Sequence, residues 1–221
     1  WHNTPPLYDD DAANGQPCLV FSGASILKTR AFDAPLPQPI SIMVVAQARG
    51  DTTIVDGLWP NSSRFELCHG YPTGWDAAPQ ICMTASGHSA SPRDSLRGST
   101  RGTGEWHLVT AIYDHAASKM FVDGRCEASG HAGANALDGL SIGCDHTGVF
   151  YLQGAIAEVR LFSCHLQPPE RIQIEAAMAR RYGLAYELAR DLGVRRRSAP
   201  SLLDCGRAVL RRLAEHHSAD D

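Results

Sequence analysis

Three glutamates on strand-like runs could act as acids or bases: Glu66, Glu105 and Glu158. Glycoside hydrolysis needs two carboxyl groups close together, one as acid and the other as nucleophile or base. None of the three has an acidic neighbour two residues away, where alternation would place it on the same strand face. The phosphate-binding, dinucleotide-binding and nucleophilic-serine motifs are also missing from the sequence. We therefore predict no catalytic residues and a chain that is not an enzyme.

Histidines and cysteines are the next candidates, as metal ligands. The chain has ten histidines and seven cysteines. No two histidines lie four residues apart on a convincing helix, and no C-x-x-C pair is present, so a histidine or zinc site is not expected. The cysteines are Cys18, Cys68, Cys82, Cys126, Cys144, Cys164 and Cys205. Their odd number leaves at least one thiol unpaired within the chain.

Aromatic residues in the region 56–82 are the best candidates for ligand binding. Trp59, Tyr71 and Trp75 lie there among Gly, Pro and Asn residues. Aromatic faces at the edge of a sandwich can stack on sugar rings, each contributing on the order of 1 kcal/mol. The alternative is that these rings pack the loop onto a sheet. Asn61-Ser62-Ser63 is an N-glycosylation pattern that matters only if a eukaryotic cell secretes the chain.

Composition limits the classes of partner. The 221 residues carry a net charge of −4, which gives no general attraction for nucleic acid, and no cofactor is predicted. No apolar run is long enough to span a bilayer. The chain begins with Trp1 and not Met, which suggests a processed form. We expect the exterior of the cell or an organelle lumen rather than the cytosol.

Short strand-like runs broken by turn residues fill most of the chain. They are Cys18–Phe21, Ile40–Ala48, Thr52–Val55, Arg64–Cys68, Gln80–Thr84, Trp106–Tyr113, Lys119–Val122, Gly139–Ile142 and Ala155–Phe162. Such a pattern predicts an all-β sandwich or barrel. In the central hairpin, alternation puts Trp106 and Leu108 on one face, with Trp106 expected as a core anchor between the sheets. The Ser-, Gly- and Arg-rich stretch 87–104 reads as a loop.

Several of these runs match motifs in a fixed order. They are Leu19–Gly23, Pro39–Val45, Trp106–Val109, Phe121–Gly124, Leu140–Gly143, Leu152–Phe162, Leu166–Arg171 and Arg180–Leu184. Together they resemble the laminin-G-like, concanavalin A-like lectin and glucanase superfamily. Ser22 departs from the pattern, because the family usually has Asp there. The resemblance implies a mainly β fold, a two-sheet antiparallel jelly roll with a C-terminal helical extension.

The resemblance implies two further features. First and last strands lie side by side in such jelly rolls, so Cys18 and Cys164 could approach closely enough for a disulfide. Related domains often hold calcium in rim loops, and Asp51, Asp123 and Asp145 are weak candidate ligands. We expect residues 1–17 to be irregular, 18–167 to form the sandwich, and 168–221 to form the helical extension.

The C-terminal region is helical in character. Pro168-Pro169-Glu170 is a good helix start and Gly183 a good stop. Further on, a basic amphipathic helix is expected to dock on a partner protein, unless it folds back on its own sandwich. The predicted docking residues are Arg195, Arg196, Arg197, Leu202, Arg207, Val209, Leu210, Arg211, Arg212 and Leu213.

Three functions follow, in order of preference. The first is an accessory subunit that docks to a larger assembly through its sandwich and tail. The second is a lectin-like domain that binds carbohydrate through its rim loops. The third is an inactive or divergent relative of glycoside hydrolases.

Overall fold

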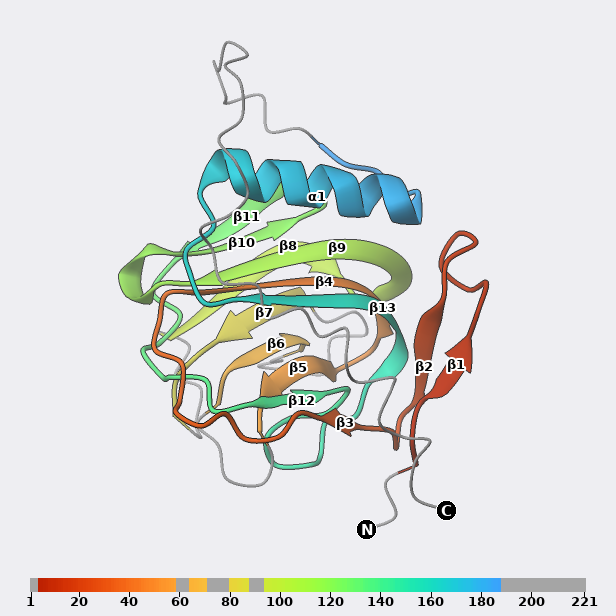
Figure 1. Cartoon of the computed structure of the whole chain (residues 1–221), viewed down its shortest axis with the longest axis horizontal. Coiled ribbons are helices and arrows are strands. Elements are labelled where there is room, and N and C mark those ends of the chain that lie inside the picture. The colour runs from red at the N-terminus through yellow and green to blue at the C-terminus, as the bar shows by residue number, and fades with distance from the viewer. Residues whose placement is uncertain (1–3, 59–63, 71–79, 88–93, 188–221) are drawn as a thin grey trace.

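The fold is a sandwich of two antiparallel sheets with one helix laid across it (Figure 1). The computed structural model describes residues 4–58, 64–70, 80–87 and 94–187. The seven-stranded sheet has the order β1 (Leu7–Asp9), β2 (Cys18–Ser22), β13 (Gln153–Phe162), β4 (Ile40–Arg49), β9 (Thr103–Tyr113), β10 (Ser118–Val122), β11 (Arg125–Gly130). The six-stranded sheet has the order β3 (Leu27–Lys28), β12 (Leu140–Ile142), β5 (Thr52–Gly57), β6 (Glu66–His69), β7 (Gln80–Thr84), β8 (Ser95–Arg101). A short 3-10 turn spans His115–Ala117, and α1 spans Pro168–Tyr182. The predicted jelly roll with a helical extension is confirmed.

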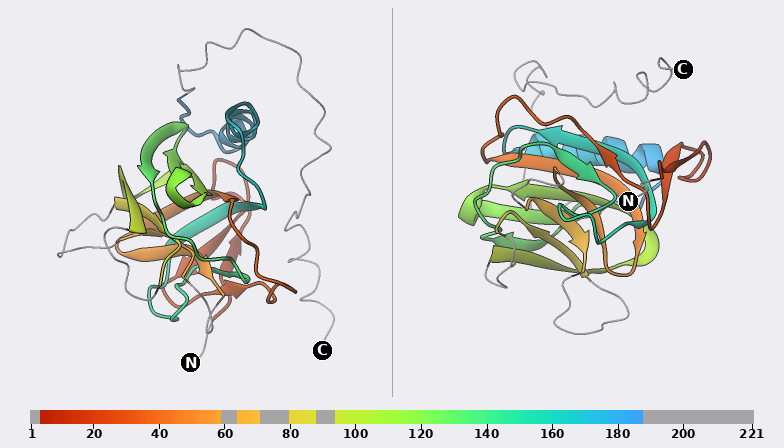
Figure 2. Two further views of the ribbon diagram at one scale, coloured as in Figure 1. Left: turned by 90° about the vertical axis from the view of Figure 1, so that its left-hand side faces the viewer. Right: turned by 90° about the horizontal axis from the view of Figure 1, so that it is seen from below.

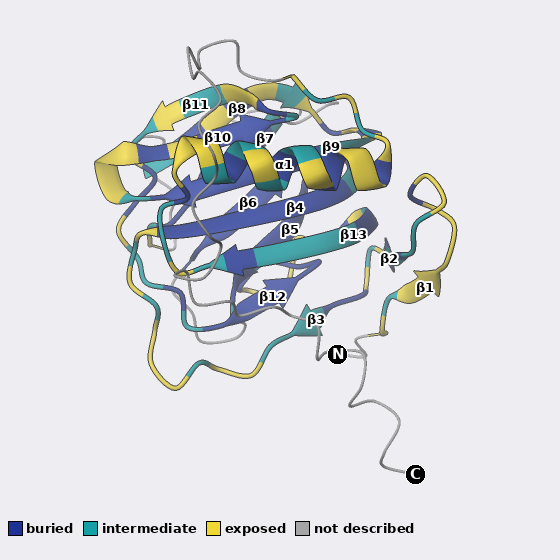
Figure 3. Cartoon of the chain, turned by 45° about the horizontal axis from the view of Figure 1, so that its top comes forward, coloured by how far each residue is buried: buried dark blue, intermediate teal, exposed yellow. Residues whose placement is uncertain are grey.

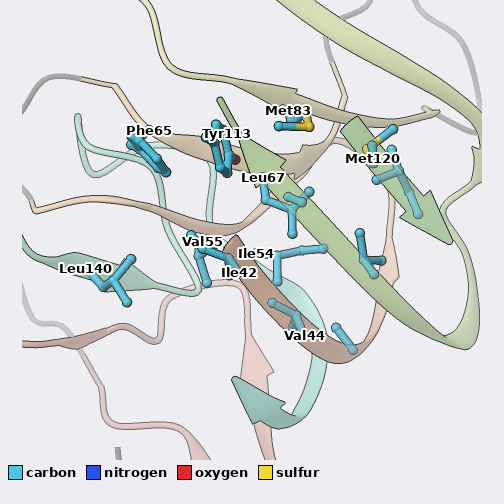
Figure 4. Packing of buried hydrophobic residues seen from close by; sticks show 14 of the residues in the cluster. Ile42, Val44, Ile54, Val55, Phe65, Leu67, Met83, Tyr113, Met120 and Leu140 are labelled. Carbon is cyan, nitrogen blue, oxygen red and sulfur yellow. The ribbon is translucent and has the colours of Figure 1, made fainter. Parts of the chain in front are cut away.

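The main core lies between the two sheets (Figure 4). Ile42 and Val44 of β4 meet Leu67 and Met83 of the other sheet there, all without solvent exposure. The Tyr113 hydroxyl donates to the backbone oxygen of Glu66 at 2.7 Å, so this buried polar atom is satisfied. Side chains of this size contribute about 1.5–3 kcal/mol each when fully buried, which makes this cluster the chief source of stability.

The central hairpin forms as predicted, but Trp106 faces the other way. Val109 and Ala111 point into the core between the sheets, whereas Leu108 and a half-buried Trp106 lie on the outer face of the seven-stranded sheet. The expectation that Trp106 anchors the core between the sheets is therefore wrong. Both faces of β9 are covered, so both carry apolar residues. Alternation in the sequence cannot show which of these faces packs against the six-stranded sheet and which packs against the helix.

Helix α1 covers that outer face (Figure 2). Met178 and Tyr182 of the helix are buried in a second apolar cluster with Met43 and Leu108 of the sheet. Buried and exposed residues alternate around the helix, as expected for a helix with one face on a sheet (Figure 3). Prolines occupy its first turn, and Gly183 ends it with φ 61°.

Two segments differ from their predicted form. Residues 1–17 were expected to be irregular, yet β1 pairs with β2 through Leu7 and Val20. The stretch 87–104, expected as a loop, contains β8. That strand is secured by Glu127 of β11, which accepts hydrogen bonds from the backbone N–H groups of Ser99 and Thr100 at 2.8 and 2.9 Å. The contacts with Glu127, which is distant in sequence, therefore stabilise a strand whose own residues have little strand propensity.

The first and last strands of the sandwich are neighbours, but the predicted disulfide is not formed. Leu19 of β2 lies opposite Ile156 of β13. Cys18 therefore lies near the middle of β13, whereas Cys164 follows the end of that strand, roughly 20 Å further along. Cys18 is a free thiol in the structure. The pairing of the strands was predicted correctly, and the register keeps the two cysteines apart.

Candidate binding face

Polar side chains cross the six-stranded sheet on the face turned away from the core. Residues opposite one another in the register share a face, and Leu67 and Met83, which alternate with them, point into the core. One row runs Lys28, Ser141, Asp56, Glu66, Thr84, Ser95, and the other runs Thr53, Cys68, Cys82, Arg97. We call these two rows the polar face. Asp56 is placed beside Glu66 by extending the β5–β6 register one residue beyond Val55–Leu67.

The middle of the polar face is closed to solvent. Asp56 and Thr53 have no exposed surface, and Glu66 has 2 %. Only the margins reach solvent, with Arg97 exposed and Lys28 half-buried. A ligand approaching this sheet would therefore meet its edges and surrounding loops before its central carboxylates.

Asp56 joins three segments of the chain. Its Oδ1 accepts the backbone N–H groups of Gly57 and Phe65, both at 2.7 Å. Its Oδ2 accepts the backbone N–H of His146 at 2.9 Å and lies 2.8 Å from Nδ1 of the same residue. The hydrogen bond to Asp56 raises the pKa of His146. A buried charge with four donors of this kind is a structural anchor, since its lone pairs are fully used.

Glu66 is the second carboxylate of the polar face. Burial, followed by the charge of Asp56, raises the pKa of Glu66 to about 7, although Arg64 opposes the shift. Its Oε1 accepts the Thr53 hydroxyl at 2.7 Å, and its Oε2 accepts Arg64 Nε at 2.7 Å. In this buried site the Glu66 carboxyl therefore keeps a proton to a higher pH than usual.

Glycoside hydrolases also use two neighbouring carboxyl groups, of which the acid has a raised pKa as Glu66 does here. Both groups are buried and their oxygens are engaged by protein donors, which leaves no opening for a sugar or an attacking water. The geometry fits a structural pair. Inspection of single strands missed it because the partner of Glu66 lies on the neighbouring strand, ten positions earlier in the sequence.

His69 is a buried histidine under the crossover from β8 to β9. It is 3 % exposed, its Nδ1 has no hydrogen-bond partner within the described chain, and it packs directly against Gly102, where an added Cβ would lie 2.3 Å from Nδ1. Burial, together with the nearby His107, lowers the pKa of His69 to about 4. His107 behaves oppositely, because its hydrogen bond to Asp123 raises its pKa.

This histidine makes the domain sensitive to acid. The unfolded chain protonates His69 near pH 6.5 and the folded chain only near pH 4, so the free energy of unfolding falls as the pH drops between these values. The loss is about 3 kcal/mol at the acid end. The free energy of unfolding, measured by urea denaturation at several pH values in this range, should fall less steeply with decreasing pH for His69→Phe than for the wild type. An equal dependence on pH for His69→Phe and the wild type would disprove the role of His69.

The remaining predicted site residues divide into two groups. Trp59, Tyr71 and Trp75 lie outside the described residues, as do the docking residues of the tail, 195–213.

The calcium candidates Asp51, Asp123 and Asp145 lie in three separate turns. Asp123 accepts the Leu108 N–H, and Asp145 accepts the Val149 N–H. In the ranges that the structure describes, no three His, Cys, Asp or Glu side chains group as metal ligands. The three calcium candidates are therefore not brought together.

Comparison with known proteins agrees with the sandwich fold. The family model Laminin_G_3, described as the concanavalin A-like lectin/glucanases superfamily, matches residues 43–170, more than half of the chain. The chain belongs to the concanavalin A-like lectin/glucanase superfamily. The matched residues run from β4 to the start of α1 and include most of the polar face. The superfamily is named for both lectins and glucanases, so membership admits binding and hydrolysis alike.

Three solved structures are similar to this chain at low sequence identity. Domain 4 of AbnA, a GH43 extracellular arabinanase from Geobacillus stearothermophilus in complex with arabinotriose, is 20% identical with a TM-score of 0.53, covering 76% of this chain and 80% of that one. Domains LG4-5 of the mouse laminin alpha1 chain are 17% identical with a TM-score of 0.49, covering 75% and 45%. The SAP-like pentraxin from Limulus polyphemus is 11% identical with a TM-score of 0.48, covering 67% and 76%. No curated protein sequence matches. Among the described helices, none is long and apolar enough to cross a membrane.

Proposed function

We propose that this superfamily member is a non-catalytic carbohydrate-binding domain that acts outside the cell or in an organelle lumen. The observation that carries the proposal is the closed pair of Asp56 and Glu66, since a hydrolase needs its carboxylates open to sugar and water. Family membership supports binding of glycan, and a domain of the same fold and similar length is known in complex with arabinotriose. Trp59, Tyr71 and Trp75 remain the predicted contacts.

Binding can be measured by calorimetry with arabinotriose and a panel of xylan-, glucan- and galactan-derived oligosaccharides. We expect one class to bind, and Trp59→Ala or Trp75→Ala to weaken it about fivefold each, the effect of losing about 1 kcal/mol of stacking. Tyr8→Ala, at a 70% exposed tyrosine of β1, should leave the affinity unchanged. Failure of every oligosaccharide to bind at millimolar concentration would contradict the proposal.

Hydrolysis is the matching control. The purified chain should release no reducing ends from the polysaccharide that it binds. Release that disappears in Glu66→Gln, while the variant keeps its fold and its binding, would make the domain an enzyme and overturn the proposal.

A protein partner is the second candidate, and one observation favours it. Helix α1 already covers the outer face of the seven-stranded sheet, so the sandwich has no evident need for the apolar stripe predicted at 202–213. The described chain ends with the Glu187 N–H donating to the Asp123 backbone oxygen at 2.8 Å. A chain truncated after Glu187 should keep its thermal midpoint and, under this alternative, lose its native partners. Unfolding of the truncated chain would place the tail in the domain's own core.

A further inference from the structure

Two cysteines on the polar face lie directly opposite each other. Cys68 of β6 is the register partner of Cys82 of β7, and both side chains lie on the face turned away from the core. They are 2 % and 1 % exposed. Both are free thiols in the structure, and the Cys82 thiol donates to the Gly70 carbonyl at 3.0 Å.

Strand geometry puts the pair within reach of a covalent bond. The Gly70 N–H donates to the Gln80 carbonyl at 3.1 Å, and pairs two residues apart in an antiparallel ladder are of the same kind. Cys68–Cys82 is therefore a hydrogen-bonded pair, with Cα atoms about 5.5 Å apart. Disulfides span Cα separations of about 4.4–6.8 Å. Rotation of the Cys82 side chain away from Gly70 would bring its sulfur toward Cys68.

We propose that Cys68 and Cys82 form a cross-strand disulfide when the chain folds under oxidising conditions. The two thiols give up two protons and two electrons, and a sulfur–sulfur bond forms. A small disulfide such as glutathione disulfide, or the disulfide of a protein oxidant, takes up the electrons and is reduced to two thiols. No pattern in the sequence singles out this pair among the seven cysteines.

Three of the other described cysteines, Cys18, Cys126 and Cys144, have neighbours other than cysteine. In the strand registers Cys18 faces Asp9, and Cys126 faces Phe121. Cys144 lies in the turn after β12, where its thiol donates to the backbone oxygen of Asp145 at 3.0 Å. Among the described residues, Cys68 and Cys82 are the pair of cysteines that a strand register brings face to face.

Burial decides when the bond can form. Burial raises the pKa of Cys82 to about 11 and that of Cys68 well above its usual value. Because the thiolate is the reacting species, a domain that has already folded with reduced thiols should oxidise slowly. The bond should therefore form before the polar face closes. It would then fix the base of the β6–β7 hairpin, whose connecting residues include Tyr71 and Trp75.

The test compares the full chain refolded with glutathione disulfide and with excess reduced glutathione. Chymotryptic cleavage after Trp75 separates the two cysteines, so mass spectrometry without reduction should find a linked peptide pair that reduction splits. The oxidised protein should melt about 5–10 °C above the reduced one. The inference fails if both cysteines accept iodoacetamide after unfolding of the oxidised protein, or if either is linked to another cysteine.

Variants provide the second readout. Cys68→Ala/Cys82→Ala should remove the difference in melting temperature between the two refolding conditions, and Cys144→Ala should preserve it. If the double variant does not fold, the peptide map of the wild type still decides. The bond concerns folding and not the ligand, so loss of glycan binding with an intact linked peptide would refute only the proposed function.

Discussion

Asp56→Asn should lower the free energy of unfolding by about 4 kcal/mol, because it leaves several buried donors without an acceptor. Asparagine has an NH₂ group, which is a donor, in place of one carboxylate oxygen. This group would face either the backbone N–H groups of Gly57 and Phe65 or the backbone N–H of His146. The residue has no exposed surface, so water cannot replace the lost partners. Urea denaturation at pH 7 measures the loss.

The control for Asp56 is Asp33→Asn, at an exposed aspartate before β4. That substitution removes one negative charge without disturbing a buried group, and it should change stability by less than about 0.5 kcal/mol. If Asp56→Asn were as mild as Asp33→Asn, the Asp56 carboxylate would not be the anchor that joins β5, β6 and the turn after β12.

Arg171→Met should be similarly damaging, with a loss of about 3–5 kcal/mol. Arg171 of α1 is 3 % exposed, pairs with the fully buried Glu175, and lies 3.6 Å above the Phe121 ring of β10. Without the guanidinium, the one hydrogen-bond donor that the described residues leave to the Glu175 carboxylate is the neutral Tyr186 hydroxyl, at 2.8 Å. An unpaired buried charge is far more costly than the pair is favourable.

A double variant separates the charge from the packing. Arg171→Met/Glu175→Leu removes both charges and keeps apolar volume under the helix, so it should recover most of the stability that Arg171→Met loses. Thermal and urea denaturation of the wild type, both single variants and the double variant form a complete cycle. A double variant as unstable as Arg171→Met would show that Arg171 acts through its contact with Phe121 and not through Glu175.

The sequence by itself determined most of the strands, the central hairpin and the start and stop of α1. These features depend on local properties: alternation, turn residues such as Asp123-Gly124, prolines in the first helical turn, and Gly183 at the helix end. The family motifs were spread along the chain in a consistent order, so they identified the superfamily without any knowledge of register.

Only the tertiary structure decided which groups meet across strands. Trp106 packs with the apolar cluster under α1 and not between the two sheets. Because β9 is covered on both faces, both faces carry apolar residues and the sequence pattern does not distinguish them. Glu66 meets Asp56, and Cys68 meets Cys82, through the registers of β5, β6 and β7. A shift of one residue in any register would turn these side chains to the opposite face. Turn geometry and irregularities such as the one between Thr53 and Val55 set those registers, and a single strand's sequence does not encode its partner.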